Sequence, residues 1–464
     1  MNSDLLAQLA THGQEHLLAH CGALSEEQQK QLAAQIRSVD LALIGRLFQN
    51  QTGEIDWAAL AARADSPPAI RLHDPNNRFS ADDARRRGKA ELKAGTVGVI
   101  LVAGGQGTRL GFPKPKGMFP IGPVSGATLF QILFEKIIAV GRRHGTRVSL
   151  YLMTSPATHE ETVEYLAAHD RFGLRADDLH IFCQGTMPAV DIATGKLLLA
   201  GKGELFLGPD GHGGTLAALD KSGGLADIRR RGLKHLFYIQ VDNPLSPICD
   251  AEYIGYHLLA ESELTTLVVA KQTPLDKVGN FVSIDGQARI IEYSDLPESA
   301  AKQTNADGSL RLWAGNTAMH VFDAGFLERM STQADSLPFH YAKKQVPFVD
   351  ATGKLVEPAA PNAIKFERFI FDLLPAAKNP LAIEVDAQTT FMPVKNAPGE
   401  KRDTPETARA ALVDLHRSWL EADGATVADG VPVEISPLFA LSAEECQGKI
   451  KPGLKIDKPR YFQP

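Results

Sequence analysis

The stretch that most constrains the fold begins near residue 96, where apolar runs and helical segments start to alternate. Residues 97–102 form a continuous run, Val-Gly-Val-Ile-Leu-Val, that is followed closely by glycines. A strand covered on both faces of a parallel sheet has this composition. Similar runs at 148–153, 180–183 and 235–241 are separated by segments of helical periodicity at 128–143, 158–169 and 225–231. The alternation predicts a doubly wound α/β core.

Two flanking regions differ from this core. Leucines at helical spacing and a plausible N-cap at Ser25 predict a helical N-terminal lobe that includes a helix at 81–92. After about residue 260 the pattern is mixed, with strands expected at 265–270, 281–284 and 289–293, and an amphipathic helix at 362–374. A helix at 405–420 and a Pro/Gly-punctuated tail follow. We therefore expect an N-terminal lobe (1–94), a catalytic core (95–385) and a small C-terminal lobe (386–464).

Composition and charge exclude several classes of protein. The chain has 464 residues, with 49 basic and 55 acidic side chains and a net charge of −6. Nucleic acid is not expected as a general partner, because binding to a phosphate backbone needs a basic face. The four cysteines lie far apart without a C-x-x-C pair, which argues against a zinc site or disulfide framework. Without a signal peptide or a membrane-length apolar run, we expect a cytoplasmic protein and no membrane partner.

The loop after the first buried strand carries the clearest chemical signal. Glycines at Gly104, Gly105 and Gly107 let backbone N–H groups approach a ligand, and Thr108 follows them. Such a turn can direct several N–H groups at one anion, while Arg109 adds a planar donor and Lys116 a point charge. The combination suits a triphosphate. The loop could also be a plain tight turn, but that leaves both cations unexplained.

Two common phosphate loops do not fit this segment. In the dinucleotide-binding pattern G-x-G-x-x-G, the third glycine would fall on Leu110. In the pattern G-x-x-x-x-G-K-[ST], a Gly-Lys-Ser/Thr sequence would have to follow, and none is present at that spacing. The segment from Leu101 to Lys116 therefore belongs to another class of loop.

The segment resembles the L-x-x-G-G-x-G-T-R-L-G-x-x-x-P-K signature of the eukaryotic-type UDP-sugar pyrophosphorylase family. Pro115-Lys-Gly-Met118 and Thr128-Leu-Phe-Gln131 are similar to the branch of that family that acts on N-acetylglucosamine 1-phosphate. The resemblance runs from about residue 95 to 437, with interruptions. It implies a Rossmann-like nucleotidyltransferase (GT-A-like) core with a mixed sheet and flanking lobes.

The resemblance also implies residues for the nucleotide. Gln184-Gly-x-Met-Pro-Ala189 resembles a family segment whose glutamine contacts uracil, and an amide can pair with the ring's N3–H and O4. A loop glutamine without a ligand is the alternative. Pro209-Asp-Gly-His-Gly-Gly214 resembles the family's P-D-G-N-G-G turn, which places Gly211 at the nucleotide and His212 near the sugar. The family has asparagine where this chain has His212, which weakens the expectation about the sugar.

A metal ion is expected at Asp242. Tyr238-Ile-Gln-Val-Asp242-Asn243 ends a buried strand in a carboxylate, and ligands of open α/β sheets lie beyond the carboxyl ends of strands. The family uses this aspartate for Mg²⁺; the alternative is an aspartate that caps the next helix.

Phe391-x-Pro-Val-Lys395 resembles a family loop whose lysine contacts phosphate.

The sugar is expected to be recognised further along the chain. Glu292-Tyr-Ser-Asp295 and Ala314-Gly-Asn316 resemble segments in which the Glu, Tyr and Asn contact the sugar. The resemblance therefore implies Glu292, Tyr293 and Asn316, with Gly279 in the preceding segment. Asn362-x-Ile-Lys365 resembles a lysine-bearing helix, although Lys365 on a solvated face is equally compatible with the sequence.

The resemblance therefore implies a uridylyltransferase that makes UDP-N-acetylglucosamine and pyrophosphate from UTP and N-acetylglucosamine 1-phosphate. Arg109, Lys116 and Lys395 are the expected catalytic residues. Glucose 1-phosphate, or a broad range of sugar 1-phosphates, is the alternative, because His212 and Phe281 depart from the family pattern. A glycosyltransferase would need an Asp-x-Asp motif, which Asp242-Asn-Pro is not. A non-catalytic sensor would not need Lys116 or Asp242. The oligomeric state is open.

Overall fold

The computed structural model describes residues 3–50, 56–333 and 337–464. Contacts divide the chain into two compact units, and neither is continuous in sequence. The first unit comprises residues 1–56, 184–215 and 335–372, and the second comprises residues 57–183, 216–334 and 373–464. The three lobes expected along the chain follow composition rather than contacts, and their boundaries stay a prediction.

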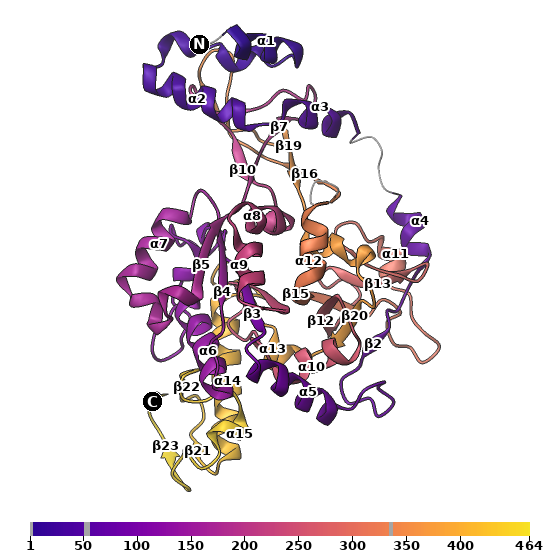
Figure 1. The fold of residues 1–464 in the computed structure, drawn as a ribbon, viewed down its shortest axis with the longest axis vertical. Coiled ribbons are helices and arrows are strands. Elements are labelled where there is room, and N and C mark those ends of the chain that lie inside the picture. Colours follow the sequence, from indigo (N-terminus) through magenta and orange to yellow (C-terminus); the bar gives the residue numbers. More distant parts are fainter. Residues whose placement is uncertain (1–2, 51–55, 334–336) are drawn as a thin grey trace. The chain divides into compact units, whose positions relative to one another are not determined.

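The second unit is built on a large mixed sheet (Figure 1). Its strand order is β2 (Ala69–Ile70), β20 (Leu381–Glu384), β12 (Leu264–Ala270), β15 (Ala314–Asp323), β11 (His235–Gln240), β3 (Val97–Val102), β4 (Leu150–Thr154) and β5 (Leu179–Cys183). Neighbouring strands are parallel except β15, which is antiparallel to both β11 and β12. The start of β15 therefore lies at the same edge as the ends of β3, β11 and β12.

A short extension joins the sheet at β15. Strands β1 (Ala64–Asp65), β13 (Asn280–Ile284) and β14 (Gln287–Ile291) form it, and β13 pairs with β15 where Asn280 lies opposite Gly315. The expected strands at 97–102, 148–153, 180–183, 235–241, 265–270, 281–284 and 289–293 are confirmed to within a few residues. Val99, Leu101, Leu150 and Phe237 are fully buried, as the continuous apolar runs predicted.

Helices surround this sheet. The second unit contains α4 (Trp57–Ala62), α5 (Ala81–Lys93), α6 (Leu129–His144), α7 (His159–Ala168), α9 (Gly224–Arg230), α10 (Ala251–Leu259), α11 (Glu298–Ala301), α12 (Ala324–Ser331), α13 (Ala387–Thr390), α14 (Pro405–Ala422) and α15 (Ala443–Cys446). Helix α8 (Thr215–Lys221) begins at the last residue of a stretch of the first unit. Thr128 is the N-cap of α6, and Thr404 forms a capping box at the start of α14. Residues next to each helix start therefore accept hydrogen bonds from its first N–H groups.

The end of the chain has a small core of its own within the second unit. Two short parallel pairs, β21 (Thr426–Val427) with β23 (Lys455–Ile456) and β22 (Val433–Ile435) with β24 (Arg460–Phe462), pack beside the end of α14. Leu420, Val433 and Cys446 are completely buried there. The helix predicted at 405–420 is confirmed.

The first unit combines short helices and small sheets. Its helices are α1 (Ser3–Thr11), α2 (Glu26–Ser38) and α3 (Leu41–Asn50), and the capping box at Ser25 confirms the expected start of α2. Its strands are β6 (Thr186–Pro188), β7 (Val190–Asp191), β8 (Leu199–Gly201), β9 (Glu204–Leu205), β10 (Leu207–Pro209), β16 (His340–Lys344), β17 (Phe348–Val349), β18 (Leu355–Val356) and β19 (Ala363–Glu367).

The helix expected at 362–374 is wrong. The segment forms β19, which pairs with β16 and β7, and then a 3₁₀ helix at Ile370–Ala376. Ile364 and Phe366 are buried and their neighbours Lys365 and Glu367 are partly exposed, which is the two-residue period of a strand. The apolar residues of a strand and of a separate turn had together imitated helical spacing.

Among the described helices, none combines the length and the apolar composition that crossing a bilayer requires.

Candidate active site

The glycine loop is closed at its base by backbone hydrogen bonds. The N–H of Lys116 donates to the carbonyl of Gly105 at 3.0 Å, and the N–H of Gly107 donates to Lys114 at 2.9 Å. A β-carbon on Gly107 would lie 2.8 Å from the carbonyl oxygen of Phe112, so only glycine allows this approach. Gly107 therefore holds the loop closed, whereas the sequence alone had suggested a nucleotide contact for it.

The top of the loop keeps its backbone donors. Within the described part of the chain, no hydrogen bond takes up the N–H groups of Gly104, Gly105 or Thr108. Gly105 and Thr108 are exposed, and the loop begins directly at the carboxyl end of β3. Unpaired N–H groups at the end of a central strand are suited to binding a phosphate.

The cations of the loop are differently placed. Arg109 lies exposed on a single 3₁₀ turn, Thr108–Leu110, and makes no ion pair with any described carboxylate. Lys116 starts the next turn, Lys116–Met118, and its Nζ lies 3.5 Å from Oδ2 of Asp242. The distance from Nζ to Oδ2 is long for an ion pair, so the ammonium keeps donor capacity.

Asp242 and Lys395 are brought together although 152 positions separate them in the chain. The carbonyl of Asp242 accepts a 2.8 Å hydrogen bond from the N–H of Val394, which precedes Lys395. The neighbouring Asn243 donates to the carbonyl of Thr390 and accepts from the N–H of Met392. The segment before Lys395 is therefore fixed against the end of β11, and Lys116, Asp242 and Lys395 form one cluster, called here the phosphate cluster.

Asp403 belongs beside this cluster, and sequence reasoning missed it. Its carbonyl accepts hydrogen bonds from the N–H groups of Lys395 and Asn396, which closes the loop that carries Lys395. Burial raises the pKa of the Asp403 carboxyl, while the charge of Lys395 lowers it and that of Asp242 raises it. The sequence around it indicates a helix start at Thr404-Pro405, but this pattern does not indicate a role for the preceding aspartate.

A second cluster contains three of the expected sugar residues. The N–H of Asn316 donates to the carbonyl of Gly279 at 2.7 Å, and a β-carbon on Gly279 would lie 2.8 Å from Oε1 of Glu292. These three residues are called here the sugar cluster. Tyr293 follows Glu292 directly and is 48% exposed.

A bulge in β15 holds Asn316 in place. The register of β15 against β12 shifts between the partners of Leu267 and Val268, and Ala318 has a φ of +58°. Oδ1 of Asn316 accepts from the N–H of Ala318, and the Thr317 hydroxyl donates to the carbonyl of Leu267. With its oxygen occupied, Asn316 has its amide N–H groups to offer a ligand. A left-handed alanine is strained, and such strain is often found at functional positions.

The remaining expected residues lie in the first unit. Gly211 has a φ of +83°, and a β-carbon there would lie 2.4 Å from the carbonyl oxygen of Arg368, so the turn requires glycine. His212 accepts a hydrogen bond at Nδ1 from the N–H of Ile370 and stacks on Phe369 at 5.2 Å between ring centroids. The histidine that replaces the family's asparagine therefore packs within its own unit.

Gln184 and Lys365 have distinct surroundings in that unit. Gln184 is 7% exposed, and no hydrogen bond joins its amide to another described residue. Lys365 lies on a strand rather than a helix, with Nζ 4.8 Å from the centre of the Phe206 ring, and burial lowers its pKa. Neither of the two alternatives that the sequence left open for Lys365 included packing on an aromatic ring.

The residues at Asp242 are compatible with Mg²⁺ carried by a substrate. Within residues 3–50, 56–333 and 337–464, no group of three or more His, Cys, Asp or Glu side chains could hold a metal ion. Mg²⁺ commonly takes one or two protein carboxylates and completes its shell with water and substrate phosphates. Asp242 is 8% exposed, and among the described residues its carboxylate has a hydrogen bond or ion pair with Lys116 alone, so it can supply one such ligand.

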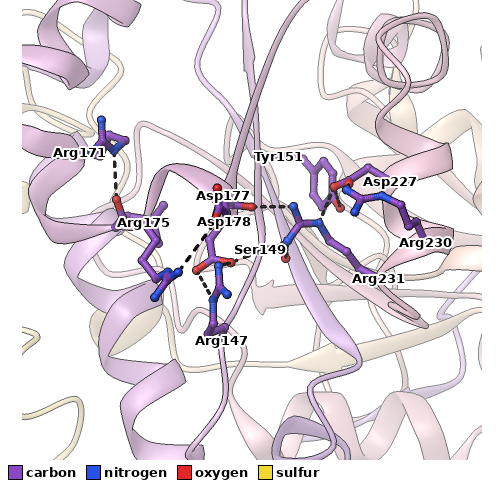
Figure 2. Close-up of polar contacts among 11 residues, drawn as sticks. Arg147, Ser149, Tyr151, Arg171, Arg175, Asp177, Asp178, Asp227, Arg230 and Arg231 are labelled. Atoms are coloured by element: carbon purple, nitrogen blue, oxygen red, sulfur yellow. Dashed lines mark hydrogen bonds and ion pairs between the residues drawn. The ribbon is translucent and has the colours of Figure 1, made fainter.

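The opposite edge of the sheet has a different polar arrangement (Figure 2). Before the starts of β4, β5 and β11 lie arginines that all make ion pairs with aspartates: Arg147 with Asp178, Arg171 with Asp170, Arg175 with Asp177, and Arg230 and Arg231 with Asp227. We call this set the arginine network. Because its arginines are paired with aspartates, the arginine network has less unpaired positive charge to bind an anion than the phosphate cluster has.

Asp227 is the centre of this network. Its Oδ2 accepts hydrogen bonds from the Tyr151 hydroxyl at 2.9 Å and from Nε of Arg231 at 2.6 Å. Burial raises the pKa of Asp227, but the hydrogen bonds from Arg231, Tyr151 and Arg230 outweigh it and lower the pKa overall.

Comparisons with known proteins agree with this geometry. The profile of the family described as UTP–glucose-1-phosphate uridylyltransferase matches residues 43–419. UDP-N-acetylglucosamine pyrophosphorylase of Saccharomyces cerevisiae is 35% identical over 96% of this chain and 98% of its own. UDP-N-acetylglucosamine diphosphorylase 2 of Arabidopsis thaliana is 34% identical, over 96% and 92% of the two chains.

A solved structure supports the fold independently. The uridine diphosphate N-acetylglucosamine pyrophosphorylase of Trypanosoma brucei, solved with an inhibitor, is 25% identical and covers 99% of both chains at a TM-score of 0.82. The predicted nucleotidyltransferase fold is confirmed. Because the family profile spans most of the sequence and these relatives span almost all of it, the chain belongs to the UTP–glucose-1-phosphate uridylyltransferase (UDPGP) family.

Proposed function

We propose that the chain is a uridylyltransferase that converts UTP and N-acetylglucosamine 1-phosphate to UDP-N-acetylglucosamine and pyrophosphate. The observation that carries the proposal is the glycine loop, with its unpaired N–H groups and exposed Arg109, next to the phosphate cluster. The choice of sugar is supported by the yeast, plant and trypanosome relatives, which are named for UDP-N-acetylglucosamine.

The reaction is a displacement at phosphorus. An oxygen of the sugar 1-phosphate attacks the α-phosphorus of UTP in line, and pyrophosphate leaves with the bond that breaks. A sugar phosphate is already ionised at neutral pH, so no general base is needed. The chain has to bring anionic groups together and stabilise the charge that moves to the leaving group.

In the second unit, cationic and N–H groups are assigned to the phosphates, and polar side chains are assigned to the sugar. In the proposal, Arg109, Lys116 and the N–H groups of Gly104, Gly105 and Thr108 bind the β- and γ-phosphates and stabilise pyrophosphate as it leaves. Lys395 binds the sugar phosphate and the equatorial oxygens of the transition state. Gly279, Glu292, Tyr293 and Asn316 bind the sugar through its hydroxyl and acetamido groups.

Mg²⁺ is part of the proposal. Asp242 would hold it, and the ion would supply charge neutralisation on the triphosphate when bound. The proposed roles of Gln184, Gly211, His212 and Lys365 rest on the motif resemblance, and a cytoplasmic location rests on the sequence.

Glucose 1-phosphate is the second candidate substrate. The family profile is described by that sugar, and His212 departs from the asparagine of the resembling motif. Pyrophosphate release from UTP should therefore be measured with N-acetylglucosamine, glucose and galactose 1-phosphates in parallel. We expect the highest kcat/KM with N-acetylglucosamine 1-phosphate; a higher value with glucose 1-phosphate would overturn the sugar, and no release with any of them would overturn the function.

A further inference from the structure

A lysine that no motif identified lies buried beside the sugar cluster. Lys271 directly follows β12 and is 8% exposed. Its Nζ donates to Oδ1 of Asn280 at 2.6 Å, and its backbone N–H donates to the carbonyl of Trp313. Burial lowers the pKa of Lys271, and the charge of Asp276 acts in the opposite direction.

Asn280 occupies the point where three strands meet. It pairs across β13 and β14 with Ile291, and across β13 and β15 with Gly315. Each member of the sugar cluster is the next residue along one of these strands: Gly279 precedes Asn280, Glu292 follows Ile291, and Asn316 follows Gly315. A shift at Asn280 would therefore move all three members.

The ammonium of Lys271 determines how the Asn280 amide is turned. With Oδ1 facing the ammonium, Nδ2 donates to the carbonyls of Ile291 and Val278, both at 3.3 Å. Without this donor, the amide could rotate, and Oδ1 would be a buried acceptor with nothing to accept from. The contact between Lys271 and Asn280 thus joins the end of β12 to β13 and β14.

A purely structural role would be better served by an apolar side chain. Burying an ammonium costs free energy that a methionine or leucine of similar volume would not. Asn280 is 2% exposed, so this polar pair lies in the interior rather than on a solvated face.

We propose that Lys271 and Asn280 are positioning residues that set the spacing of Gly279, Glu292 and Asn316, and thereby the affinity for the sugar 1-phosphate and the preference between an acetamido and a hydroxyl group. The proposal rests on the proposed function, since it assigns specificity within the same site. Lys271 acts through Asn280 and does not itself touch the substrate.

The test compares Lys271→Met, Asn280→Leu and the double variant with Lys302→Met, which makes the same change at an exposed lysine. Both single variants should raise the KM for N-acetylglucosamine 1-phosphate about tenfold, because small displacements of positioning groups weaken selective binding. The KM for UTP should stay within about twofold of the parent value. The ratio of kcat/KM for N-acetylglucosamine 1-phosphate to kcat/KM for glucose 1-phosphate should also change. In the double variant, the KM for N-acetylglucosamine 1-phosphate should not exceed that of the more impaired single variant, because the two residues act as one unit.

Equal changes in both KM values, unchanged values, or additive effects in the double variant would overturn the proposal. If Lys271→Met does not fold, Asn280→Asp provides the same test, since it keeps the acceptor for Lys271 and removes the donations to Ile291 and Val278. A folded Asn280→Asp with the parent KM for the sugar phosphate would also overturn it. An inactive parent enzyme would instead refute the proposed function.

Discussion

The two edges of the central sheet both carry charged side chains but differ in how those charges are partnered. At the carboxyl edge, Arg109 makes no ion pair with a described residue, and Lys116 has only a 3.5 Å contact with Asp242. At the amino edge, every arginine of the arginine network has an aspartate partner, and Figure 2 shows the group around Asp178 and Asp227. An edge with unmatched cations can bind an anion, whereas a matched edge stabilises the fold.

The largest expected effect is on catalysis at the carboxyl edge. Arg109→Ala and Lys116→Ala should each lower kcat about 10²–10³-fold, the usual loss for one preorganised charge contact to a transition state. Their unfolding temperatures should match that of the parent, because neither side chain has a strong internal partner. Steady-state pyrophosphate release and thermal unfolding measure the two effects.

Arg175→Ala, at the amino edge, is the matched control for this prediction. Its side chain is 65% exposed and its ion pair with Asp177 is 3.7 Å long. Activity should be that of the parent. A turnover of Arg109→Ala within a few-fold of the control would remove Arg109 from the chemistry.

The second expected effect is a loss of stability without a loss of activity, at the amino edge. Asp227→Asn should lower the free energy of unfolding by about 2 kcal/mol, since it weakens charge-assisted hydrogen bonds to Tyr151 and Arg231. The kcat and KM of the folded enzyme should not change. Urea unfolding and steady-state kinetics on the same preparation test this, and a loss of kcat without a loss of stability would mean that the amino edge is not purely structural.

The third effect concerns the metal ion. Asp242→Asn should raise the Mg²⁺ concentration for half-maximal activity about tenfold, because an amide is a weaker ligand than a carboxylate. Asp227→Asn makes the same substitution at the other edge and should leave the Mg²⁺ titration unchanged. Superimposable titrations for the parent and Asp242→Asn would show that Asp242 does not hold the ion.

The smallest effect is the pH dependence of the arginine network. Since the folded-state pKa of Asp227 is lowered, its contribution to stability is complete above the unfolded pKa of about 4 and is lost as the pH falls through the folded value. The difference in unfolding free energy between the parent and Asp227→Asn should thus be constant from pH 5 to 8 and narrow below pH 4. A difference that grows on acidification would contradict the assigned cause.

The sequence predicted most of the second unit because its signals are local. The buried run at residues 97–102, the helical spacing at 128–143 and the cations of the glycine loop are each encoded within a few residues, as is the cap at Ser25 in the first unit. The helix expected at 362–374 was wrong because strand pairing between β19, β16 and β7 is a long-range property that apolar spacing does not reveal.

The parts of the site that could not be predicted depend on contacts between distant residues. The hydrogen bond between Val394 and Asp242, the bulge at Ala318 and the pair formed by Lys271 and Asn280 join segments whose order along the chain gives no indication of contact. Gly107 is the opposite case, since its motif was visible but its N–H is used within the loop.

The proposed transfer of the uridylyl group can be observed through the phosphorus atoms of the substrates and products. Purified protein mixed with UTP, Mg²⁺ and N-acetylglucosamine 1-phosphate can be monitored by ³¹P NMR. We expect the signals of a UDP-sugar and of pyrophosphate to grow in equal amounts as both substrates disappear, and Arg109→Ala to slow both signals equally. Formation of UDP and orthophosphate, or unchanged substrates in the presence of folded protein, would contradict the proposed transfer.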